Sequence, residues 1–179
     1  MKYNPTGIRK IRPIPFSGDV YFHAVDSIGK RGYITTAGKF NFKGTPIYFG
    51  MLNEQDLVKA ASLHAGKHGV SLLGYAEPRR PYVMEVSLQT VADLRDENNI
   101  KKLGLKVDDI LGSDRSKTQK VGKRAIAIRV QGILFPSYAG DCLVIFKDVI
   151  DLLKEPEKAI KIRPINHYNF RDYIKRFLS

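Results

Sequence analysis

The chain has 179 residues, of which 43% are hydrophobic and 10% aromatic, a composition that suits one compact domain with its own core. Thirty basic residues against eighteen acidic ones give a formal net charge of +12, which attracts polyanions such as nucleic acid, an acidic protein or a dinucleotide. The sequence excludes a helical membrane span, because it has no run of about eighteen apolar residues, and its single cysteine, Cys142, excludes an internal disulfide.

The pattern of apolar residues, glycines and prolines predicts short strands that alternate with helices. In chain order we expect a strand at residues 20–25, a turn-rich loop at 29–42, a strand at 45–50, a helix at 53–67, a strand at 82–88, helical turns at 93–102 and 107–111, a helix at 117–130, strands at 133–135 and 143–146, and a helix at 166–179. Asn53 is expected to cap the helix at 53–67, with Glu54 and Asp56 in its first turn. The chain is therefore predicted to be an α+β protein.

The last predicted helix, at residues 166–179, is amphipathic. Its apolar residues recur at helical spacing opposite Arg171, Lys175 and Arg176, and Pro164 breaks whatever precedes it. We expect this helix to dock on its own domain, and a contact with a second copy or with a protein partner is the alternative. The predicted division is a basic segment at 1–17, a domain at 18–150 and a helical extension at 151–179.

The basic residues gather in three places along the chain. They are the start (Lys2, Arg9, Lys10, Arg12), a central stretch (Arg115, Lys117, Lys120, Lys123, Arg124, Arg129) and the tail (Lys158, Lys161, Arg163, Arg171, Lys175, Arg176). A solvated surface, an acidic protein partner and nucleic acid all remain open as explanations. Zinc-finger spacing, a Walker-type glycine loop and an aromatic RNA-binding motif are absent from the sequence, so nucleic acid ranks below the other two. The start is basic without an apolar stretch behind it, and we expect a cytoplasmic protein.

Two segments place polar groups at the edges of apolar strands. Residues 38–49 read GKFNFKGTPIYF, and residues 131–137 read QGILFPS, with Thr118 and Gln119 upstream of the second segment. These motifs, in this order, resemble the RES domain family, named for its Arg, Glu and Ser positions, and the resemblance covers residues 18–150. It implies a single domain with an ADP-ribosyltransferase-like, split mixed β-sheet core and flanking helices. It also implies a bacterial toxin of a toxin–antitoxin pair that consumes NAD⁺, by hydrolysis or phosphorolysis of the nicotinamide–ribose bond or by ADP-ribosyl transfer.

The resemblance assigns NAD⁺-binding roles residue by residue. Where the family pattern has its first Arg this chain has His23, which can still donate a hydrogen bond, and the second Arg falls on Lys39, which keeps the charge without the bidentate fork. Tyr48 matches the pattern and is expected to pack on nicotinamide and to take part in catalysis. Ser137 also matches, and we expect its hydroxyl and backbone N–H to orient a ribose or phosphate.

The carboxylate position of the family falls on Lys59, eleven residues after Tyr48. A lysine there would repel an oxocarbenium-like transition state. Asp56 lies three residues earlier on nearly the same helical face and is our candidate for a relocated catalytic carboxylate, with Glu85 as a second candidate. Lys59 would then contribute to binding NAD⁺ or an extra phosphate.

No metal is predicted. His64 and His68 lie four residues apart, but the sequence offers no third ligand at a matching spacing. A different class of function also remains open: a RES-like protein without activity that serves as a basic binding module for a protein partner or nucleic acid. A homodimer is a further alternative that the sequence does not decide.

Overall fold

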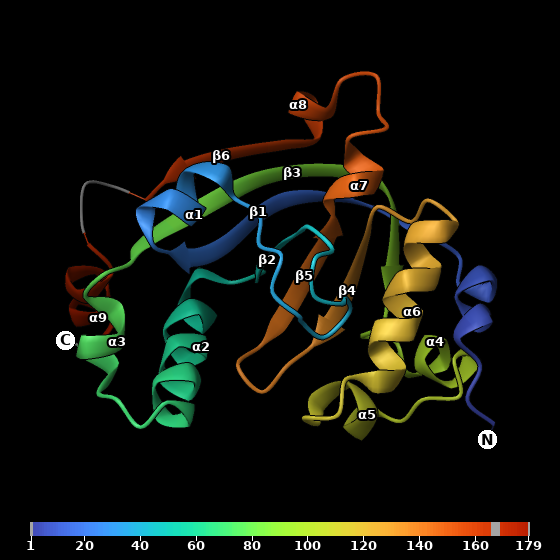
Figure 1. Cartoon of the computed structure of the whole chain (residues 1–179), viewed down its shortest axis with the longest axis horizontal. Helices are drawn as coiled ribbons and strands as arrows, with labels where there is room; N and C mark the ends of the chain where they lie inside the picture. The colour runs from blue at the N-terminus through green and yellow to red at the C-terminus, as the bar shows by residue number, and fades with distance from the viewer. Residues whose placement is uncertain (1, 166–168, 179) are drawn as a thin grey trace.

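The computed structural model describes residues 2–165 and 169–178, and its centre is a six-stranded mixed β-sheet with helices on both faces (Figure 1). The strands are β1 (Ile14–Ala24), β2 (Ile47–Met51), β3 (Arg80–Asp93), β4 (Gly132–Pro136), β5 (Asp141–Phe146) and β6 (Ile160–Pro164). The helices are the 3-10 helix η1 (Pro5–Lys10) and the α-helices α1 (Asp26–Arg31), α2 (Glu54–Lys67), α3 (Leu72–Ala76), α4 (Glu97–Lys102), α5 (Val107–Leu111), α6 (Ser116–Ala127), α7 (Lys147–Ile150), α8 (Pro156–Ala159) and α9 (Phe170–Leu178).

The sheet consists of two halves that meet over short stretches. In one half β3 pairs antiparallel with β1 and β6, and in the other β5 pairs antiparallel with β2 and β4. The halves are joined by a single residue pair between β1 and β2, Tyr21 with Met51, and by a short parallel stretch between β3 and β4 at residues 91–93. The predicted α+β fold with a split, mixed sheet is confirmed.

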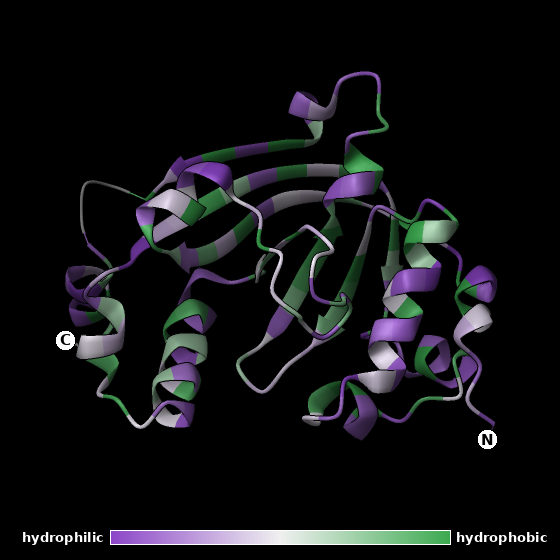
Figure 2. Cartoon of the chain, in the orientation of Figure 1, coloured by the Kyte–Doolittle hydropathy of each residue, from purple (hydrophilic) through white to green (hydrophobic). Residues whose placement is uncertain are grey.

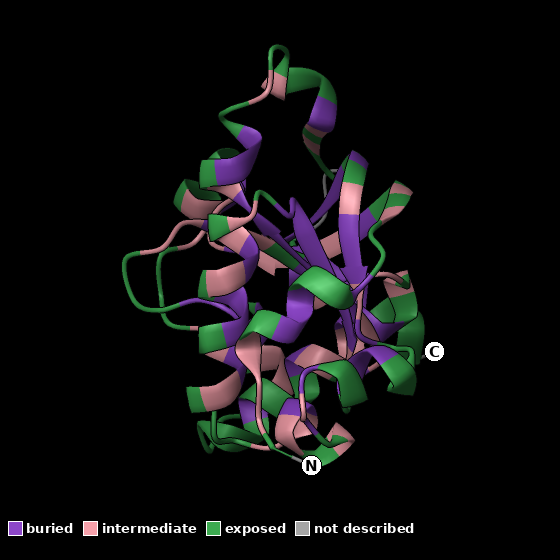
Figure 3. Ribbon diagram, turned by 90° about the vertical axis from the view of Figure 1, so that its right-hand side faces the viewer, coloured by how far each residue is buried: buried purple, intermediate pink, exposed green. Residues whose placement is uncertain are grey.

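The two faces of the sheet carry separate hydrophobic cores, because alternate side chains of a strand point in opposite directions. On β4, Ile133 and Phe135 lie in a first core with residues of α2 to α6 and α9, whereas Leu134 lies in a second core. The second core is completed by residues of α1 and α8, such as Ile28 and Ala159. Figure 2 shows the central strands as mostly green, hydrophobic bands, and Figure 3 shows them as buried.

Several elements are longer than predicted or were not predicted. β1 and β3 extend beyond the expected residues 20–25 and 82–88, because they pair with each other along most of their length. The loop expected at 29–42 contains the end of α1, which stops at Gly32, where φ is +77°. α3 and β6 have five residues each, too few for a clear period in the sequence.

Both ends of the chain pack into the first core. Ile8 and Ile11 near the amino terminus are buried there, as are Phe170, Tyr173 and Ile174 of α9. The predicted terminal helix therefore docks on its own domain, although residues 166–168 and 179 of the predicted range lie outside the described residues. The boundaries at 17 and 150 stay a prediction. Among residues 2–165 and 169–178, none of the helices has the length and apolar character needed to cross a bilayer.

Candidate functional site

The turn at residues 38–44 is held in place by the start of α6. Gln119 donates from Nε2 to the carbonyl oxygens of Gly38 and Asn41, each at 3.1 Å. Gly122 of α6 packs against the Phe40 carbonyl so closely that a Cβ there would lie 1.7 Å from its oxygen. Gln119 lies 81 residues after Gly38 and 78 after Asn41 in the sequence, so the turn and the start of α6 form one structural unit.

Lys39 in this turn lies among other cations. Its ammonium group donates to the carbonyl of Gly112, just before α6. Burial lowers the pKa of Lys39, and the positive charges of Arg115 and Lys67 lower it further. Lys67 is in the last turn of α2 and Arg115 is the N-cap residue of α6, so positive charges from two helices act on Lys39, and Asp114 partly offsets them. Such a cluster suits an anionic group such as a diphosphate.

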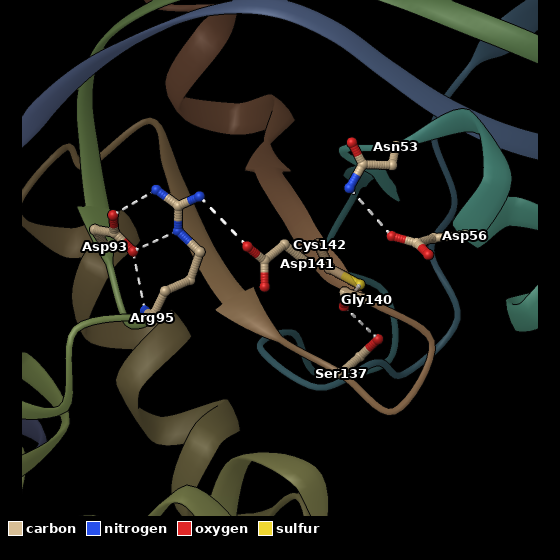
Figure 4. A network of polar contacts seen from close by, with 8 residues as sticks. All are labelled: Asn53, Asp56, Asp93, Arg95, Ser137, Gly140, Asp141 and Cys142. Atoms are coloured by element: carbon tan, nitrogen blue, oxygen red, sulfur yellow. Dashed lines mark hydrogen bonds and ion pairs between the residues drawn. The ribbon is translucent and has the colours of Figure 1, made fainter.

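The carboxylate of Asp56 lies in the first turn of α2, where it is 7% exposed. Lys59 donates to Asp56 Oδ1 at 2.7 Å. Figure 4 shows the other hydrogen bond of this carboxylate, from Asn53 Nδ2 to Oδ2 at 3.2 Å. Asn53 occupies the predicted N-cap position, but its side chain makes no capping bond, because its amide group faces Asp56 instead. The lysine that sequence spacing assigns to the family's carboxylate position thus pairs with the carboxylate one turn earlier.

Ser137 begins the turn that joins β4 to β5. Its hydroxyl donates to the carbonyl of Gly140 at 2.7 Å and accepts the N–H of Ala139 at 3.2 Å. Gly140 has φ +144°, and a Cβ at this position would lie 2.1 Å from Asp56 Oδ2. The turn and the buried carboxylate are therefore in direct contact, and only glycine fits between them. Two predicted site residues, 81 positions apart, are brought together here.

A second polar group lies beside this turn and was not predicted. Arg95 binds Asp93 at 2.7 Å and Asp141 at 3.4 Å, and so ties the end of β3 to the start of β5 (Figure 4). Burial acts to raise the pKa of Asp93, but the hydrogen bonds from Arg95 outweigh it and the pKa lies below its ordinary value. Because both carboxylates already neutralise Arg95, we interpret this group as a structural clamp next to the Ser137 turn.

His23 on β1 is enclosed by aromatic rings. It stacks on Phe170 of α9 with 4.7 Å between ring centroids and meets the edge of Tyr75 of α3 at 5.6 Å. Burial lowers the pKa of His23 to about 3, assisted by the positive charges of His64 and Arg79, and its Nδ1 atom is buried without a hydrogen-bond partner. This environment keeps the imidazole neutral. The predicted hydrogen bond from His23 to NAD⁺ stays a prediction.

Tyr48 points to the opposite face of the sheet from Asp56. It packs against the second core and meets the ring of Tyr33 at 6.1 Å. Its neighbour Phe49 points to the first face, is 36% exposed, and lies 6.3 Å from the ring of Phe135. An exposed aromatic ring on the same face as Asp56 is the surface that a planar nicotinamide or adenine ring needs. The sequence motif drew attention to Tyr48 and missed Phe49, although strand alternation could have identified it.

The other candidates lie apart from this group. Glu85 on β3 pairs with Arg163 of β6 at 3.3 Å, and His64 faces the Tyr75 hydroxyl at 3.3 Å. Cys142 is buried, and burial raises the pKa of its thiol to about 11, so it is a core residue. Within the part of the chain that the structure describes, three or more possible metal ligands do not come together.

The predicted residues thus fall into three places. The first place is the start of α2, where the buried carboxylate of Asp56 meets Lys59 and the turn of Ser137. The second is the environment of Lys39, where the charges of Lys67 and Arg115 act. His23 and Tyr48 are held in aromatic surroundings away from both. Lys67 and Arg115 were missed as neighbours of Lys39 because the sequence does not show which helix ends approach that residue, whereas alternation along β2 could have identified Phe49.

Comparisons with known proteins agree with this architecture. A family model described as the RES domain matches residues 18–167. A chain in the crystal structure of the M. tuberculosis MbcT–MbcA toxin–antitoxin complex superposes with a TM-score of 0.77 at 19% sequence identity, over 96% of this chain and 94% of that chain. No curated protein sequence matches the chain.

Proposed function

The chain belongs to the RES domain family, and on that premise we propose that it is an NAD⁺-consuming toxin that acts inside a bacterial cell. The observation that carries the proposal is the contact between the buried Asp56 carboxylate and the turn of Ser137. A carboxylate of fixed position beside a serine hydroxyl is suited to binding a ribose and to stabilising positive charge that develops on it.

The proposed reaction breaks the bond between nicotinamide and C1′ of the ribose. Nicotinamide leaves with the bonding electrons, positive charge develops at C1′ and O4′, and the nucleophile that then attacks C1′ is water, phosphate or an acceptor side chain. Asp56 stabilises the developing charge, and Ser137 orients the ribose. Lys39 and its neighbouring cations bind the diphosphate, and an aromatic ring, Tyr48 by the sequence motif or Phe49 by its position, packs on a base.

Lys59 must move for this reaction. Its side chain is 65% exposed, whereas that of Asp56 is 10% exposed, so the lysine can swing toward solvent while the carboxylate stays in place. A phosphate of the substrate would attract the freed ammonium. Lys59 thus contributes to binding NAD⁺ and exposes the catalytic carboxylate only when a substrate is present.

The experiment is nicotinamide release from NAD⁺ by the purified chain and by Asp56→Asn. We expect the variant to lose at least about 100-fold in rate, the scale of a lost electrostatic contact to a transition state. Asp109→Asn is the matched control, because Asp109 also lies in the first turn of a helix and pairs with a lysine, Lys117, at 2.7 Å. Equal rates for wild type and Asp56→Asn would exclude Asp56 as the catalytic carboxylate.

The ion pair of Asp56 with Lys59 also favours a second function. A carboxylate that stays neutralised cannot stabilise positive charge, and the domain would then be an inactive, basic binding module. In that case wild type releases no nicotinamide, and Lys59→Glu, which restores the carboxylate at the family position, also releases none. If Lys59→Glu releases nicotinamide and wild type does not, the site lacks only the carboxylate at position 59 and is otherwise able to carry out the reaction.

An antitoxin-like protein is the partner we propose. The superposed chain comes from a toxin–antitoxin complex, and the charge of +12 favours an acidic partner. Co-expression of a neighbouring gene followed by size-exclusion chromatography would detect such a complex. The same measurement on the chain alone would report a homodimer.

A further inference from the structure

The basic residues at the start of the chain and those of the central stretch form one surface. η1 packs beside α6, and Tyr3 donates its hydroxyl to the Lys117 carbonyl at 2.8 Å. We call this surface the basic face. It consists of exposed or partly exposed cations of η1 and α6 and of the residues just after each helix: Arg9, Lys10, Arg12, Lys120, Lys123, Arg124 and Arg129. Both elements lie at the same end of the molecule (Figure 1).

The composition of α6 runs against helix stability. Its twelve residues include Lys117, Lys120, Lys123 and Arg124 and no acidic residue. Basic side chains three and four residues apart repel one another, and Lys117 lies in the first turn, where the helix dipole disfavours positive charge. Val121 and Ala125 on the buried side of α6 would pack in the same way if the outer side carried both acidic and basic residues. The positive charge of the outer side is therefore retained at a cost.

The cations of the basic face lack partners in the fold. Within residues 2–165 and 169–178, none of their side chains makes an ion pair or a hydrogen bond. The Nε atom of Arg124 is buried and has no hydrogen-bond partner there. Two acidic side chains of the adjoining helices α5 and α4 are already engaged: Asp109 pairs with Lys117, and Glu97 pairs with Lys101.

Arg129 gives an independent indication. It follows α6 and has φ +61°, and it is the one residue other than glycine with positive φ in the described part of the chain. Glycine or asparagine is the usual residue at such a position, because a side chain with a Cβ is strained there. The side chain of Arg129 is exposed, so packing does not explain why an arginine is kept.

The chemistry of the basic face favours nucleic acid over a protein or a bilayer. The exposed large apolar side chains of the described residues lie elsewhere: Phe42, Phe49, Leu63, Val70, Tyr138, Leu152, Phe177 and Leu178. Protein interfaces are built around apolar and aromatic residues and contain few lysines, and a membrane-surface helix needs an apolar face to insert. A phosphate backbone needs only cations. The lack of an aromatic platform also means that bases are not stacked on this surface.

From these observations we infer that the basic face binds the phosphate backbone of a nucleic acid duplex without sequence specificity, separately from the NAD⁺ site. The binding is electrostatic and releases counterions, so its affinity depends steeply on salt. With about four phosphate contacts, the affinity should fall about 100-fold between 50 and 200 mM salt. This inference goes beyond the proposed enzymatic function and does not depend on it.

The test measures fluorescence anisotropy of a labelled short DNA duplex of scrambled sequence, titrated with the full chain. The triple variant Lys120→Ala, Lys123→Ala, Arg129→Gly should bind at least about 10-fold more weakly and show a shallower salt dependence, by roughly 0.9 in slope for each lost contact. The control variant Lys30→Ala, Lys154→Ala, Lys161→Ala removes the same charge from α1, the α7–α8 loop and β6 and should bind like wild type.

Each outcome bears on the inference. Equal loss in both triple variants would show that net charge alone attracts the duplex, and would overturn it, as would a lack of binding by wild type at low salt. Binding of anionic lipid vesicles or polyglutamate through the same three residues, without binding of the duplex, would overturn it in favour of a membrane or an acidic protein. Nicotinamide release by the triple variant is expected to be retained, and its melting temperature is expected to be no lower than that of wild type; both results would show that the fold and the NAD⁺ site are intact.

Discussion

The ion pair of Lys59 with Asp56 is the residue-level feature that most affects the chemistry of this chain. Sequence spacing assigns this lysine to the position where the RES pattern has a carboxylate, and the structure places its ammonium 2.7 Å from Asp56 Oδ1. Gly140 permits this arrangement, because any larger residue would push the Ser137 turn away from the carboxylate. Asp56, Lys59 and the distant Gly140 thus decide whether a negative charge is available at the candidate site.

His23 should make the stability of the fold depend on pH. The pKa of His23 is about 3 in the folded chain and about 6.5 in the unfolded chain. At a pH between these two values the unfolded state therefore binds a proton that the folded state does not bind. The contribution of the neutral His23 to stability is therefore complete above about pH 6.5 and is lost as the pH falls toward its folded pKa. We expect the urea midpoint to fall less between about pH 7 and pH 5 in His23→Phe than in wild type.

The exposed His68→Phe variant is the control for the loss of an imidazole. An identical pH dependence in wild type and His23→Phe would mean that His23 is not shielded from protons in the folded chain. Weak NAD⁺ binding by a stable His23→Phe would support the ligand role that the sequence motif suggests.

Arg129 should limit the stability of the chain. Its left-handed backbone conformation, φ +61°, destabilises a residue with a Cβ by about 1–2 kcal/mol. Glycine avoids this strain, but its greater freedom in the unfolded state cancels about 0.5–1 kcal/mol of the gain. We expect Arg129→Gly to be more stable than wild type by about 0.5–1 kcal/mol in urea unfolding. Arg129→Ala keeps the strain and should show no such gain; equal stabilities of the two variants would argue against strain at this residue.

At the level of elements, α6 has two separate roles on two sides. Its inner side holds the turn at 38–44 through Gln119 and the close approach of Gly122 to Phe40. Its outer side displays cations that the fold does not use. The same helix therefore positions one candidate site and forms part of another, and substitutions can separate the two because they concern different faces.

The terminal helix α9 is a structural element of the first core. Phe170 has no exposed surface and stacks on His23, whereas Phe177 is 41% exposed. Phe170→Ala should reduce the free energy of unfolding by roughly 3–5 kcal/mol, the usual cost of a cavity of this size. Phe177→Ala should cost less than about 1 kcal/mol. Similar small effects in both variants, measured by urea unfolding, would show that α9 docks only loosely.

At the level of the whole molecule, both kinds of site lie on the first-core side of the sheet, and α6 stands between them. In Figure 1 the turn between β4 and β5, which carries Ser137, lies between two groups of helices: α2, α3 and α9 on one side and α4, α5 and α6 on the other. The basic face lies on the outside of one of these groups, on α6 and η1. A net charge of +12 is thus divided into cations that face the candidate NAD⁺ site and cations that face solvent.

The sequence alone predicted the fold class, the longest helices, the central strands and the family, because hydrophobic period, glycines and the motifs at 38–49 and 131–137 are local properties. It also indicated Asp56 and Ser137 as candidate site residues. Only the tertiary structure decided which residues meet: that Asp56 touches the Ser137 turn, that Tyr48 faces away and Phe49 faces the site, and that α9 covers His23. These contacts depend on strand register and helix packing between segments far apart in the chain, which local patterns do not encode.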